Sequence, residues 1–400
     1  MNILFLCHDL PNPSNPLTFR VYHTAKYLAR RYNHNITIAA FKEKKHAERY
    51  TWHLEDFSQL EIVEIPEFNS QLSKLIYVIL NMLSPQNLFS KQPALFNFYY
   101  SSRMHRVVED IFKKGIDVVF LDLFYLLPYV LDKEIPKMLE VWDEGDAYYV
   151  EYKSSKGARK LYLWLMYNLI KRYENKYSEL NVCITASEDE KEKLERRFNL
   201  NNIRIIPYGV DIEHFKPTNI EEDFPSLVFV GNMKTKVNEH AIIYFYEKIF
   251  PLIKNKVPHV KLYIVGKDPT EKILELSSDD NIIITGYVDD VRPYYARASI
   301  VILPIIKSVG FRTRALEAMA MGKAVIATSV ATRGIDVTPD ENIIIADDPK
   351  EFAERVIQLL SNEDMRHKIG KNARRLIEEK YSWRRMSEEF HKILTTTVND

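Results

Sequence analysis

Short apolar runs alternate with longer stretches of helical periodicity along two parts of this chain. Each run predicts a buried strand, and each longer stretch with apolar residues three or four positions apart predicts a helix. The runs of the first part are Asn2–Cys7, Asn35–Phe41, Leu60–Ile65, Asp117–Leu121, Met138–Trp142, Asn181–Thr185 and Ile203–Ile206. Those of the second part are Leu227–Val230, Lys261–Val265, Ile282–Thr285, Ile300–Leu303, Ala324–Ala327 and Ile343–Ile345. Helical periodicity marks Thr18–Arg31, Phe96–Lys114, Ser154–Ser178, Glu239–Lys254, Arg312–Met321, Pro349–Leu360 and Asp364–Glu379.

Apolar strands that alternate with helices are typical of parallel sheets covered by helices on both faces. A single sheet of so many strands would be unusually wide, so the sequence predicts two Rossmann-like, doubly wound α/β domains. The least periodic stretch, Pro207–Pro225, contains three prolines and an acidic cluster and predicts the linker between them. A last helix, Trp383–Leu394, carries a one-sided apolar stripe. Ligands of such sheets bind beyond the carboxyl ends of the strands, so we expect the chemistry in the turns that follow them.

The overall composition excludes several classes of protein. Fifty-five basic residues balance 55 acidic ones, which removes the basic footprint typical of a nucleic-acid-binding protein. A hydrophobic content of 46% excludes intrinsic disorder, and two cysteines build neither a disulfide framework nor a cysteine-based zinc site. The amino terminus lacks the basic start of a signal peptide, and the apolar runs are shorter than a membrane span. We therefore expect a cytoplasmic protein; contact with the inner face of the membrane stays open.

The segment 308–328 contains the most informative chemistry. It predicts a loop, a helix and a buried strand, with Gly310, Arg312, Thr313 and Arg314 at the helix start. Unpaired amides at a helix N-terminus, together with two guanidinium groups, suit the diphosphate of a nucleotide. Glu317 lies one turn further on, where a carboxylate suits the two hydroxyl groups of a ribose. The alternative is a solvated Arg–Glu face of an ordinary helix.

Several motifs in order resemble the retaining glycosyltransferases of the group 1 family, which have the GT-B fold. The run Leu316–Ala327 resembles that family's Glu-containing helix and following strand, with Ala324 where the family usually has proline. The resemblance is close from about residue 200 to 385 and looser before it. Further matching stretches are Ile206–Asp211 with Phe215–Pro217, Phe229–Met233, Leu262–Gly266 and Ile284–Val291.

The resemblance implies a domain organisation and a site. Residues 1–207 would bind the acceptor, residues 208–381 the nucleotide sugar, and residues 382–400 would form a helix that crosses back to the first domain, with the two domains facing across a cleft. The turn at Gly286, Tyr287 and Val288 would meet the nucleotide base, and Gly231 and Gly266 would approach the donor. The family needs no bound metal, and its nucleotide sugar is a substrate, so no cofactor is expected.

The sequence departs from the family pattern at the donor site. A glutamate that is often found before Glu317 is replaced by Val309, so donor identity is open. Gly310–Arg314 resembles instead the version found in exopolysaccharide-type sugar transferases. Gly231 is followed by Asn232 where the family often has arginine, and Lys236 or Lys234 is a candidate for the missing cation. Both lysines are equally compatible with a solvent-facing role.

The first domain offers weaker candidates. Thr18 and Arg20 open the first helix and are candidate phosphate contacts, and Pro16 stands where the family usually has glycine. Asp143 and Asp146 follow a buried strand and resemble an Asp-x-x-Asp pattern that would orient or deprotonate an acceptor hydroxyl group. Structural capping and a metal site are the alternatives.

The sequence thus predicts an enzyme that transfers a sugar from a nucleotide-sugar donor to a glycan or lipid-linked acceptor, with retention and without a metal. Arg312, Arg314 and Asp143 are its catalytic candidates. Two alternatives stay open: a nucleotide-sugar 2-epimerase of the same fold, and a partner subunit of this fold without activity.

Overall fold

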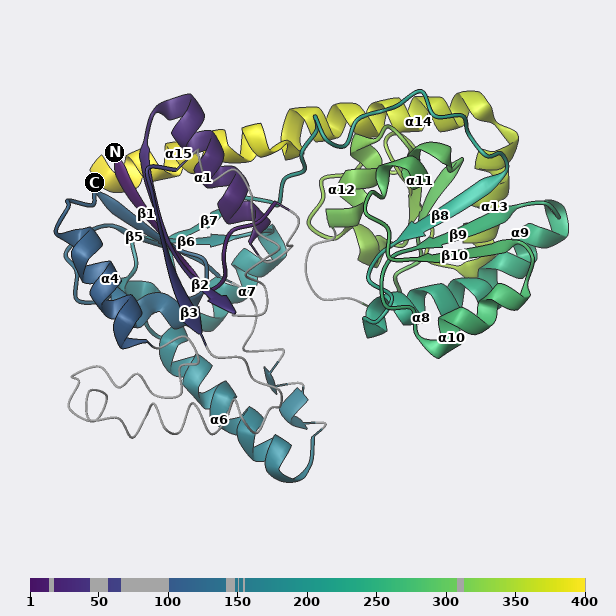
Figure 1. The fold of residues 1–400 in the computed structure, drawn as a ribbon. Helices are drawn as coiled ribbons and strands as arrows, with labels where there is room; N and C mark the ends of the chain where they lie inside the picture. Colours follow the sequence, from purple (N-terminus) through teal and green to yellow (C-terminus); the bar gives the residue numbers. More distant parts are fainter. Residues whose placement is uncertain are drawn as a thin grey trace. The chain divides into compact units, whose positions relative to one another are not determined.

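The structure is a computed structural model that describes residues 1–13, 18–43, 57–65, 101–141, 148–149, 151–153, 155–307 and 313–399. The chain divides into two units (Figure 1). The first comprises residues 1–206 together with 387–400, and the second comprises residues 207–386. Each unit is described by itself below.

The first unit is built on a seven-stranded parallel sheet with the strand order β3-β2-β1-β4-β5-β6-β7. The order reverses between β1 and β4, which is the topological switch point of the sheet. Its strands are β1 (Asn2–Cys7), β2 (Asn35–Glu43), β3 (Gln59–Ile65), β4 (Val118–Leu121), β5 (Lys137–Glu140), β6 (Val182–Thr185) and β7 (Ile203–Ile205). Every residue of β4, β5 and β6 is buried, as expected for strands covered on both faces.

The helices of this unit include one that the hydrophobic pattern did not predict. They are α1 (Phe19–Tyr32), α4 (Ser102–Phe112), α6 (Gly157–Glu174) and α7 (Glu188–Phe198). The unpredicted helix is α7, which has no fully buried residue and packs on the core through only two apolar side chains, Leu194 and Phe198. It begins where the Ser187 hydroxyl accepts the Glu190 amide and ends at Asn199, which has a left-handed conformation.

The second unit is built on a six-stranded parallel sheet with the order β10-β9-β8-β11-β12-β13. Here the switch point lies between β8 and β11. Its strands are β8 (Ser226–Val230), β9 (Lys261–Val265), β10 (Ile282–Gly286), β11 (Ile300–Leu303), β12 (Ala324–Ala327) and β13 (Ile344–Ile345). With both sheets parallel and doubly wound, the predicted fold class is confirmed.

Helices lie on both faces of the second sheet, with α8 and α10 below it and α12 and α14 above it in the view of Figure 1. They are α8 (Lys236–Tyr244), α9 (Phe250–Lys256), α10 (Glu271–Leu274), α11 (Arg292–Arg297), α12 (Thr313–Ala320), α13 (Pro349–Ser361) and α14 (Glu363–Leu376). The stretch predicted as one helix over Glu239–Lys254 is interrupted by a π-helical turn over Phe245–Ile249. Pro251 follows that turn, and since proline lacks the amide that a regular helix needs, the helix continues only as α9.

The last helix, α15 (Trp383–Asn399), packs mainly on the first unit. Phe390 is buried there, with its ring centre 6.2 Å from that of Phe5 and 5.2 Å from that of Phe120. Glu388 forms an ion pair of 3.1 Å with Arg31 of α1. In Figure 1, α15 (yellow) accordingly runs beside α1 (purple). The carboxyl-terminal residues therefore complete the core of the first unit.

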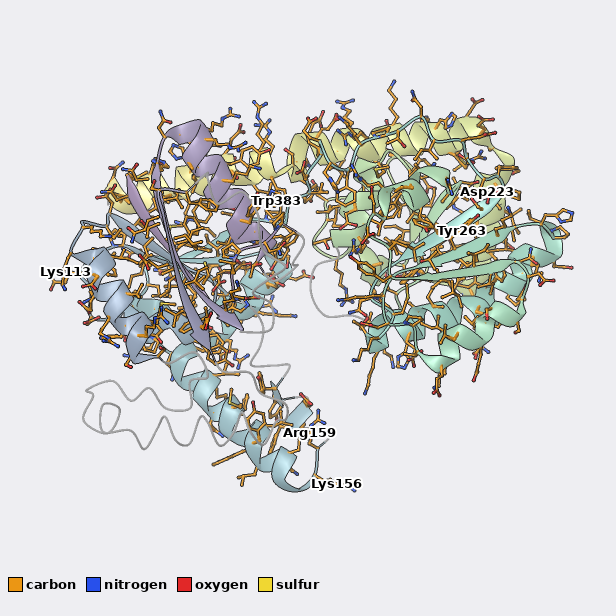
Figure 2. All side chains as sticks on the ribbon, in the orientation of Figure 1. Lys113, Lys156, Arg159, Asp223, Tyr263 and Trp383 are labelled. Atoms are coloured by element: carbon orange, nitrogen blue, oxygen red, sulfur yellow. The ribbon has the colours of Figure 1, made fainter. Side chains whose placement is uncertain are left out.

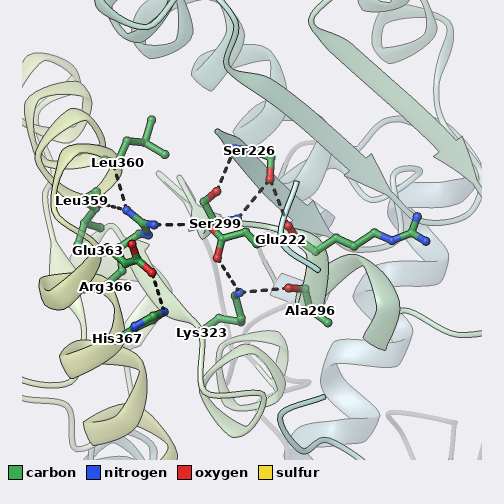
Figure 3. A network of polar contacts seen from close by, with 11 residues as sticks. Glu222, Ser226, Ala296, Ser299, Lys323, Leu359, Leu360, Glu363, Arg366 and His367 are labelled. Atoms are coloured by element: carbon green, nitrogen blue, oxygen red, sulfur yellow. Dashed lines mark hydrogen bonds and ion pairs between the residues drawn. The ribbon is translucent and has the colours of Figure 1, made fainter. Parts of the chain in front are cut away.

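The predicted linker is bound to the second unit rather than loose. The Arg374 guanidinium donates to the carbonyl groups of Ile212 and Phe215, at 3.1 and 2.6 Å. Further along, Glu222 lies between two cations, 3.7 Å from Lys323 and 3.5 Å from Arg366 (Figure 3). Burial lowers the pKa of Lys323, so the ion pair with Glu222 offsets part of the cost of holding that charge.

Candidate functional site

Three glycines lie side by side at the carboxyl edge of the second sheet. The Gly231 amide donates to Val265 across 2.9 Å, and the Gly266 amide donates to Gly286 across 3.1 Å. Gly266 has a φ of 146°, and a Cβ atom added to it would lie 1.7 Å from the Gly231 carbonyl oxygen. Because no side chain fits between Gly266 and Gly231, the turns after β8 and β9 pack directly on each other, while Gly286 after β10 has open space beside it. Such turns permit the close approach of a ligand to the main chain.

Asn232 builds the turn that leads into α8. Its side-chain oxygen accepts the Lys234 amide at 3.1 Å, and its carbonyl group accepts Asn238 Nδ2 at 2.9 Å. A Cβ atom on Gly231 would lie 2.6 Å from the same Asn238 nitrogen. Lys234 and Lys236 are both exposed and form no ion pair within the described parts of the chain. Asn232 therefore shapes the turn, and the structure leaves both lysine side chains in solvent.

The strongest polar arrangement of this edge surrounds Glu317. Arg314 Nη1 lies 2.6 Å from Glu317 Oε2, one helical turn away on α12. Tyr295, on α11, donates its hydroxyl group to the same oxygen across 3.3 Å. Glu317 Oε1 forms no hydrogen bond with any residue that the structure describes. One carboxylate oxygen is thus held by two donors from two helices, and the other can accept further bonds.

The ionisation of this cluster follows from its burial. Tyr295 is completely buried, and this burial, reinforced by Glu317, raises the pKa of its phenol well above 10. The carboxylate raises the pKa of Arg314 in turn. Tyr295 therefore remains a hydrogen-bond donor and Arg314 remains a cation at physiological pH. The carboxylate is fixed in orientation, which the solvated-face alternative did not anticipate.

Sequence reasoning missed Tyr295 and Asn238. Tyr295 lies in Arg292–Arg297, which is too short to show helical periodicity and was not predicted. The only signal was the aromatic pair Tyr294–Tyr295 between two arginines. Asn238 lay in the first turn of a helix that we predicted from Glu239 onwards. The N-cap Thr235, which accepts the Asn238 amide, could have located that start.

Two further residues that we predicted to bind the nucleotide-sugar donor follow β10. Tyr287 is 71% exposed, and Val288 is half-buried against the hydrophobic core of the second unit. Gly286 before them has a φ of 67° with open space around it. The structure places this turn next to Gly266 and Gly231 on the same edge of the sheet.

Some predicted residues cannot be placed. Gly310 and Arg312, with Val309, lie outside the described residues; Thr313 is described and is the first residue of α12. Asp143 and Asp146 of the first unit, and Pro16, also lie outside the described residues. Their predicted roles stay predictions.

The two remaining candidates of the first unit are buried rather than presented to a ligand. Thr18 accepts the Asn12 amide at 3.1 Å and holds the turn after β1. Arg20 Nε lies 3.0 Å from the buried Glu140, and its Nη1 donates to Ile206 across 2.8 Å. This ion pair connects α1 with the ends of β5 and β7. The structure thus shows a packing role for Arg20 that the sequence did not predict, and its predicted phosphate contact stays a prediction.

One protein-family model matches part of the second unit. Residues 224–362, which include the glycine turns, Tyr295 and Glu317, match the model described as glycosyl transferases group 1. This part of the chain is similar to the group 1 glycosyltransferases. The resemblance noted in the sequence is therefore confirmed. Among the described residues, no helix is long and apolar enough to cross a bilayer.

The curated relatives of this chain include a glycosyltransferase of capsular polysaccharide biosynthesis. A 44.6 kDa protein in the cps region of Klebsiella pneumoniae is 23% identical over 268 residues, which are 64% of this chain and 68% of that protein. The capsular polysaccharide biosynthesis glycosyltransferase CapM of Staphylococcus aureus is 26% identical over 241 residues. That alignment covers 54% of this chain and 62% of CapM.

Solved structures share the fold over the whole chain. Sucrose-phosphate synthase from Thermosynechococcus elongatus has a TM-score of 0.67 at 16% identity and 99% coverage of both chains. HepE of Anabaena in complex with UDP-glucose has a TM-score of 0.66 at 13% identity, with 98% of this chain and 99% of HepE covered. At such identities the likeness shows the GT-B fold alone.

Proposed function

We propose that this protein is a group 1 glycosyltransferase that transfers a sugar from a nucleoside-diphosphate sugar to a glycan or lipid-linked acceptor. The observation that carries the proposal is the fixed carboxylate of Glu317, with Oε2 bound by Arg314 and Tyr295. It lies on α12, which follows β11, one of the two strands at the switch point of the second sheet. Nucleotides bind doubly wound sheets at that position, and acidic side chains there bind ribose hydroxyl groups.

The donor site uses the rest of this edge. Glu317 Oε1 accepts the ribose hydroxyl groups, and the turn Gly286–Val288 meets the base. The diphosphate binds at the N-terminus of α12, to which Thr313 and Arg314 belong, and Gly310 and Arg312 precede them in the sequence. Gly231 and Gly266 let the donor approach the backbone, and Lys236 at the start of α8 is a further candidate cation. HepE was solved with UDP-glucose, and a TarM variant of Staphylococcus aureus with UDP, which supports a uridine nucleotide as the first donor to test.

The reaction breaks the bond between the anomeric carbon and the diphosphate, whose oxygen keeps the electron pair. The acceptor hydroxyl oxygen forms the new bond to that carbon, and its proton passes to a base, for which Asp143 is the candidate. Fixed cations stabilise the charge that develops on the diphosphate. We extend the proposal to retention at the anomeric carbon and to activity without a bound metal, as the family resemblance implies. In this proposal the first unit binds the acceptor, with Asp143 and Asp146 orienting its hydroxyl group.

A lipid-linked acceptor is supported by one surface of the first unit. Leu161 and Trp164 of α6 are 60% and 45% exposed, and Lys156 and Arg159 lie at the end of α6 that is far from the sheet (Figure 2). Residues 152–173 contain six basic and no acidic side chains, although the whole chain has no net charge. Exposed apolar side chains with cations near them in the chain suit an anionic membrane surface. We therefore propose that α6 contacts the membrane.

The test is a screen of the purified protein against nucleoside-diphosphate sugars with sugar and lipid-linked acceptors, with and without EDTA. Product analysis by mass spectrometry and NMR reports transfer and anomeric configuration. Replacement of Arg312 and Arg314 by alanine should lower turnover about a hundredfold. A donor converted only to its 2-epimer, or full turnover in the double variant, would overturn the proposal. A protein that binds donor but never transfers would be the inactive partner subunit instead.

A further inference from the structure

A cavity of about 500 Å³ lies between the linker of the second unit and the junction of α13 with α14. This volume is within the range of cavities that bind small ligands. Phe224 stands just before β8, whereas Gly231 follows that strand, so the cavity and the candidate donor site lie at opposite edges of the second sheet. The residues that line the cavity include Glu222, Phe224, Leu360, Glu363, Arg366 and His367.

The guanidinium group of Arg366 is buried but only partly bonded. Arg366 is 7% exposed, and its Nη1 donates to the carbonyl groups of Leu359 and Leu360 across 2.9 and 3.0 Å. Among the described residues, Nη2 contacts only Glu222 Oε1, across 3.5 Å, and Nε has no hydrogen-bond partner. A guanidinium group carries five N–H donors, and buried donors are normally satisfied. Arg366 therefore has donors left for a ligand of the cavity that it lines.

Glu222 supplies acceptors beside these donors. Its Oε1 lies 3.5 Å from Arg366 Nη2, and its Oε2 lies 3.7 Å from Lys323 Nζ (Figure 3). Both distances exceed those of a strong charge-assisted hydrogen bond, so the described residues saturate neither oxygen. The Glu222 side chain is 27% exposed and can therefore be reached from the cavity. A guanidinium group and a carboxylate thus stand side by side, and each can bind a further partner.

An aromatic ring completes the cavity. Arg366 Cζ lies 5.1 Å from the centre of the Phe224 ring, so a cation–π contact holds the ring from one side. Phe224 is nevertheless 55% exposed. Charge is balanced as well, because the two cations of this network are matched by two carboxylates, Glu222 and the exposed Glu363. An exposed ring beside paired donors and acceptors, without excess charge, suits a neutral polar ligand that has an apolar face.

We propose that this cavity binds a sugar unit of a glycan. The C–H groups of a pyranose ring pack on the negative face of an aromatic ring, here Phe224. Adjacent sugar hydroxyl groups both donate and accept, so one donates to Glu222 while its neighbour accepts from Arg366. The inference rests on the proposed function for its ligand class, since a glycan is the acceptor and product named there. A second site for the same glycan raises the effective concentration of that glycan at the enzyme.

The test measures the binding of defined tetrasaccharides to the full chain. The probes are maltotetraose, cellotetraose, chitotetraose and mannotetraose. Phe224→Ala removes the ring, and Phe224→Trp keeps an aromatic face. Leu274→Ala changes another exposed apolar residue of the second unit and is the matched control. Thermal unfolding and calorimetric titration with UDP establish that each variant is folded with an intact donor site.

Two measurements decide the outcome. In ¹⁵N-labelled protein, at least one tetrasaccharide should shift the Arg366 Nε–H signal with a Kd below roughly 10 mM. Phe224→Ala should raise the Kd of that probe at least roughly tenfold, whereas Phe224→Trp should stay within about threefold of the parent. Leu274→Ala should bind the probe as the parent does. The Kd of UDP should stay within about twofold in all three variants.

Failure of this inference is separable from failure of the proposed function, because neither measurement depends on sugar transfer. Absence of the Arg366 shift with all four probes would overturn the inference. An unchanged Kd in the folded Phe224→Ala variant would overturn it as well. A protein that transfers sugar but gives either of these results keeps the proposed function and lacks the second site. A protein that binds a tetrasaccharide at Phe224 but never transfers sugar keeps the site and loses the proposed function.

Discussion

The hydroxyl group of the buried Tyr295 donates to Glu317 Oε2 across 3.3 Å, from a helix that precedes α12 in the chain. Together with Arg314, it fixes the carboxylate before any nucleotide arrives. A pre-oriented acceptor loses less side-chain entropy on binding than a mobile one.

Replacement of Glu317 by Gln should therefore weaken UDP binding, because a charge-assisted hydrogen bond contributes about 1.5–3 kcal/mol. Tyr295→Phe should weaken it less, by about 1 kcal/mol, since the carboxylate remains but loses one donor. Calorimetric titration with UDP measures both. Glu379→Gln, on the exposed end of the α14 region, is the control and should bind as the parent does. Equal affinities in all four proteins would show that Glu317 is an ordinary surface carboxylate.

The glycine contact at the same edge gives a second prediction. Gly266→Ala should destabilise the second unit by about 3 kcal/mol, because its Cβ atom would meet the Gly231 carbonyl group. Gly286→Ala is the control, as it has a positive φ but open space, and should cost about 1 kcal/mol. Denaturant titration separates the two. A Gly266→Ala variant as stable as Gly286→Ala would contradict the close packing of these turns.

Membrane contact through α6 predicts that Leu161→Ser with Trp164→Ser lowers binding to vesicles containing anionic lipids at least roughly tenfold, since each side chain contributes about 1.5–3 kcal/mol when buried. Co-sedimentation measures the bound fraction. Leu252→Ser, which changes an exposed apolar residue of the second unit, should leave it unchanged. Equal sedimentation of the double variant and the parent would remove α6 from the proposal.

The pair His34 and His391 predicts a pH dependence of stability. Burial, with the amino terminus and His391 nearby, lowers the pKa of His34 from 6.5 to about 4, and burial also lowers that of His391. The unfolded chain therefore takes up protons more readily, so the free energy of unfolding is retained above pH 6.5 and decreases as the pH falls towards 4. The thermal midpoint should be lower at pH 5 than at pH 7.5, with a smaller difference in His34→Gln. The exposed His367→Gln should behave as the parent does; a parent-like difference in His34→Gln would argue against this origin.

Phe390 tests the attachment of α15. Phe390→Ala should cost about 3–5 kcal/mol of stability in the first unit, because it empties a buried position against Phe5 and Phe120. Phe224→Ala, an exposed residue of the second unit, is the control. Hydrogen exchange of β1 and β4 amides follows the first unit directly, and unchanged protection in Phe390→Ala would show that α15 contributes little there.

The hydrophobic pattern predicted every described strand of both sheets to within two residues, because most of them, such as β4, β6 and β11, are buried along their whole length. It failed for α7, in which only Leu194 and Phe198 pack against the core, although Ser187 and the acidic residues after it mark a helix start. Glu317 was recognised through its spacing from Arg314 on one helix. Tyr295 and Arg366 were missed because tertiary packing brings each of them to its partner residue. No local spacing in the sequence marks such a contact.

The two ends of the second unit lie next to each other, and this bears on whether the unit can be produced as a separate protein. Val210 accepts the Trp383 amide and donates to Tyr381 across 2.8 Å, so the point of entry and the point of exit adjoin. The second unit is in effect an insertion within a discontinuous first unit, a topology in which the inserted domain tolerates excision. Residues 207–386 should therefore fold alone and bind nucleotide. Residues 1–206, in contrast, need the carboxyl-terminal part of α15 to complete their core.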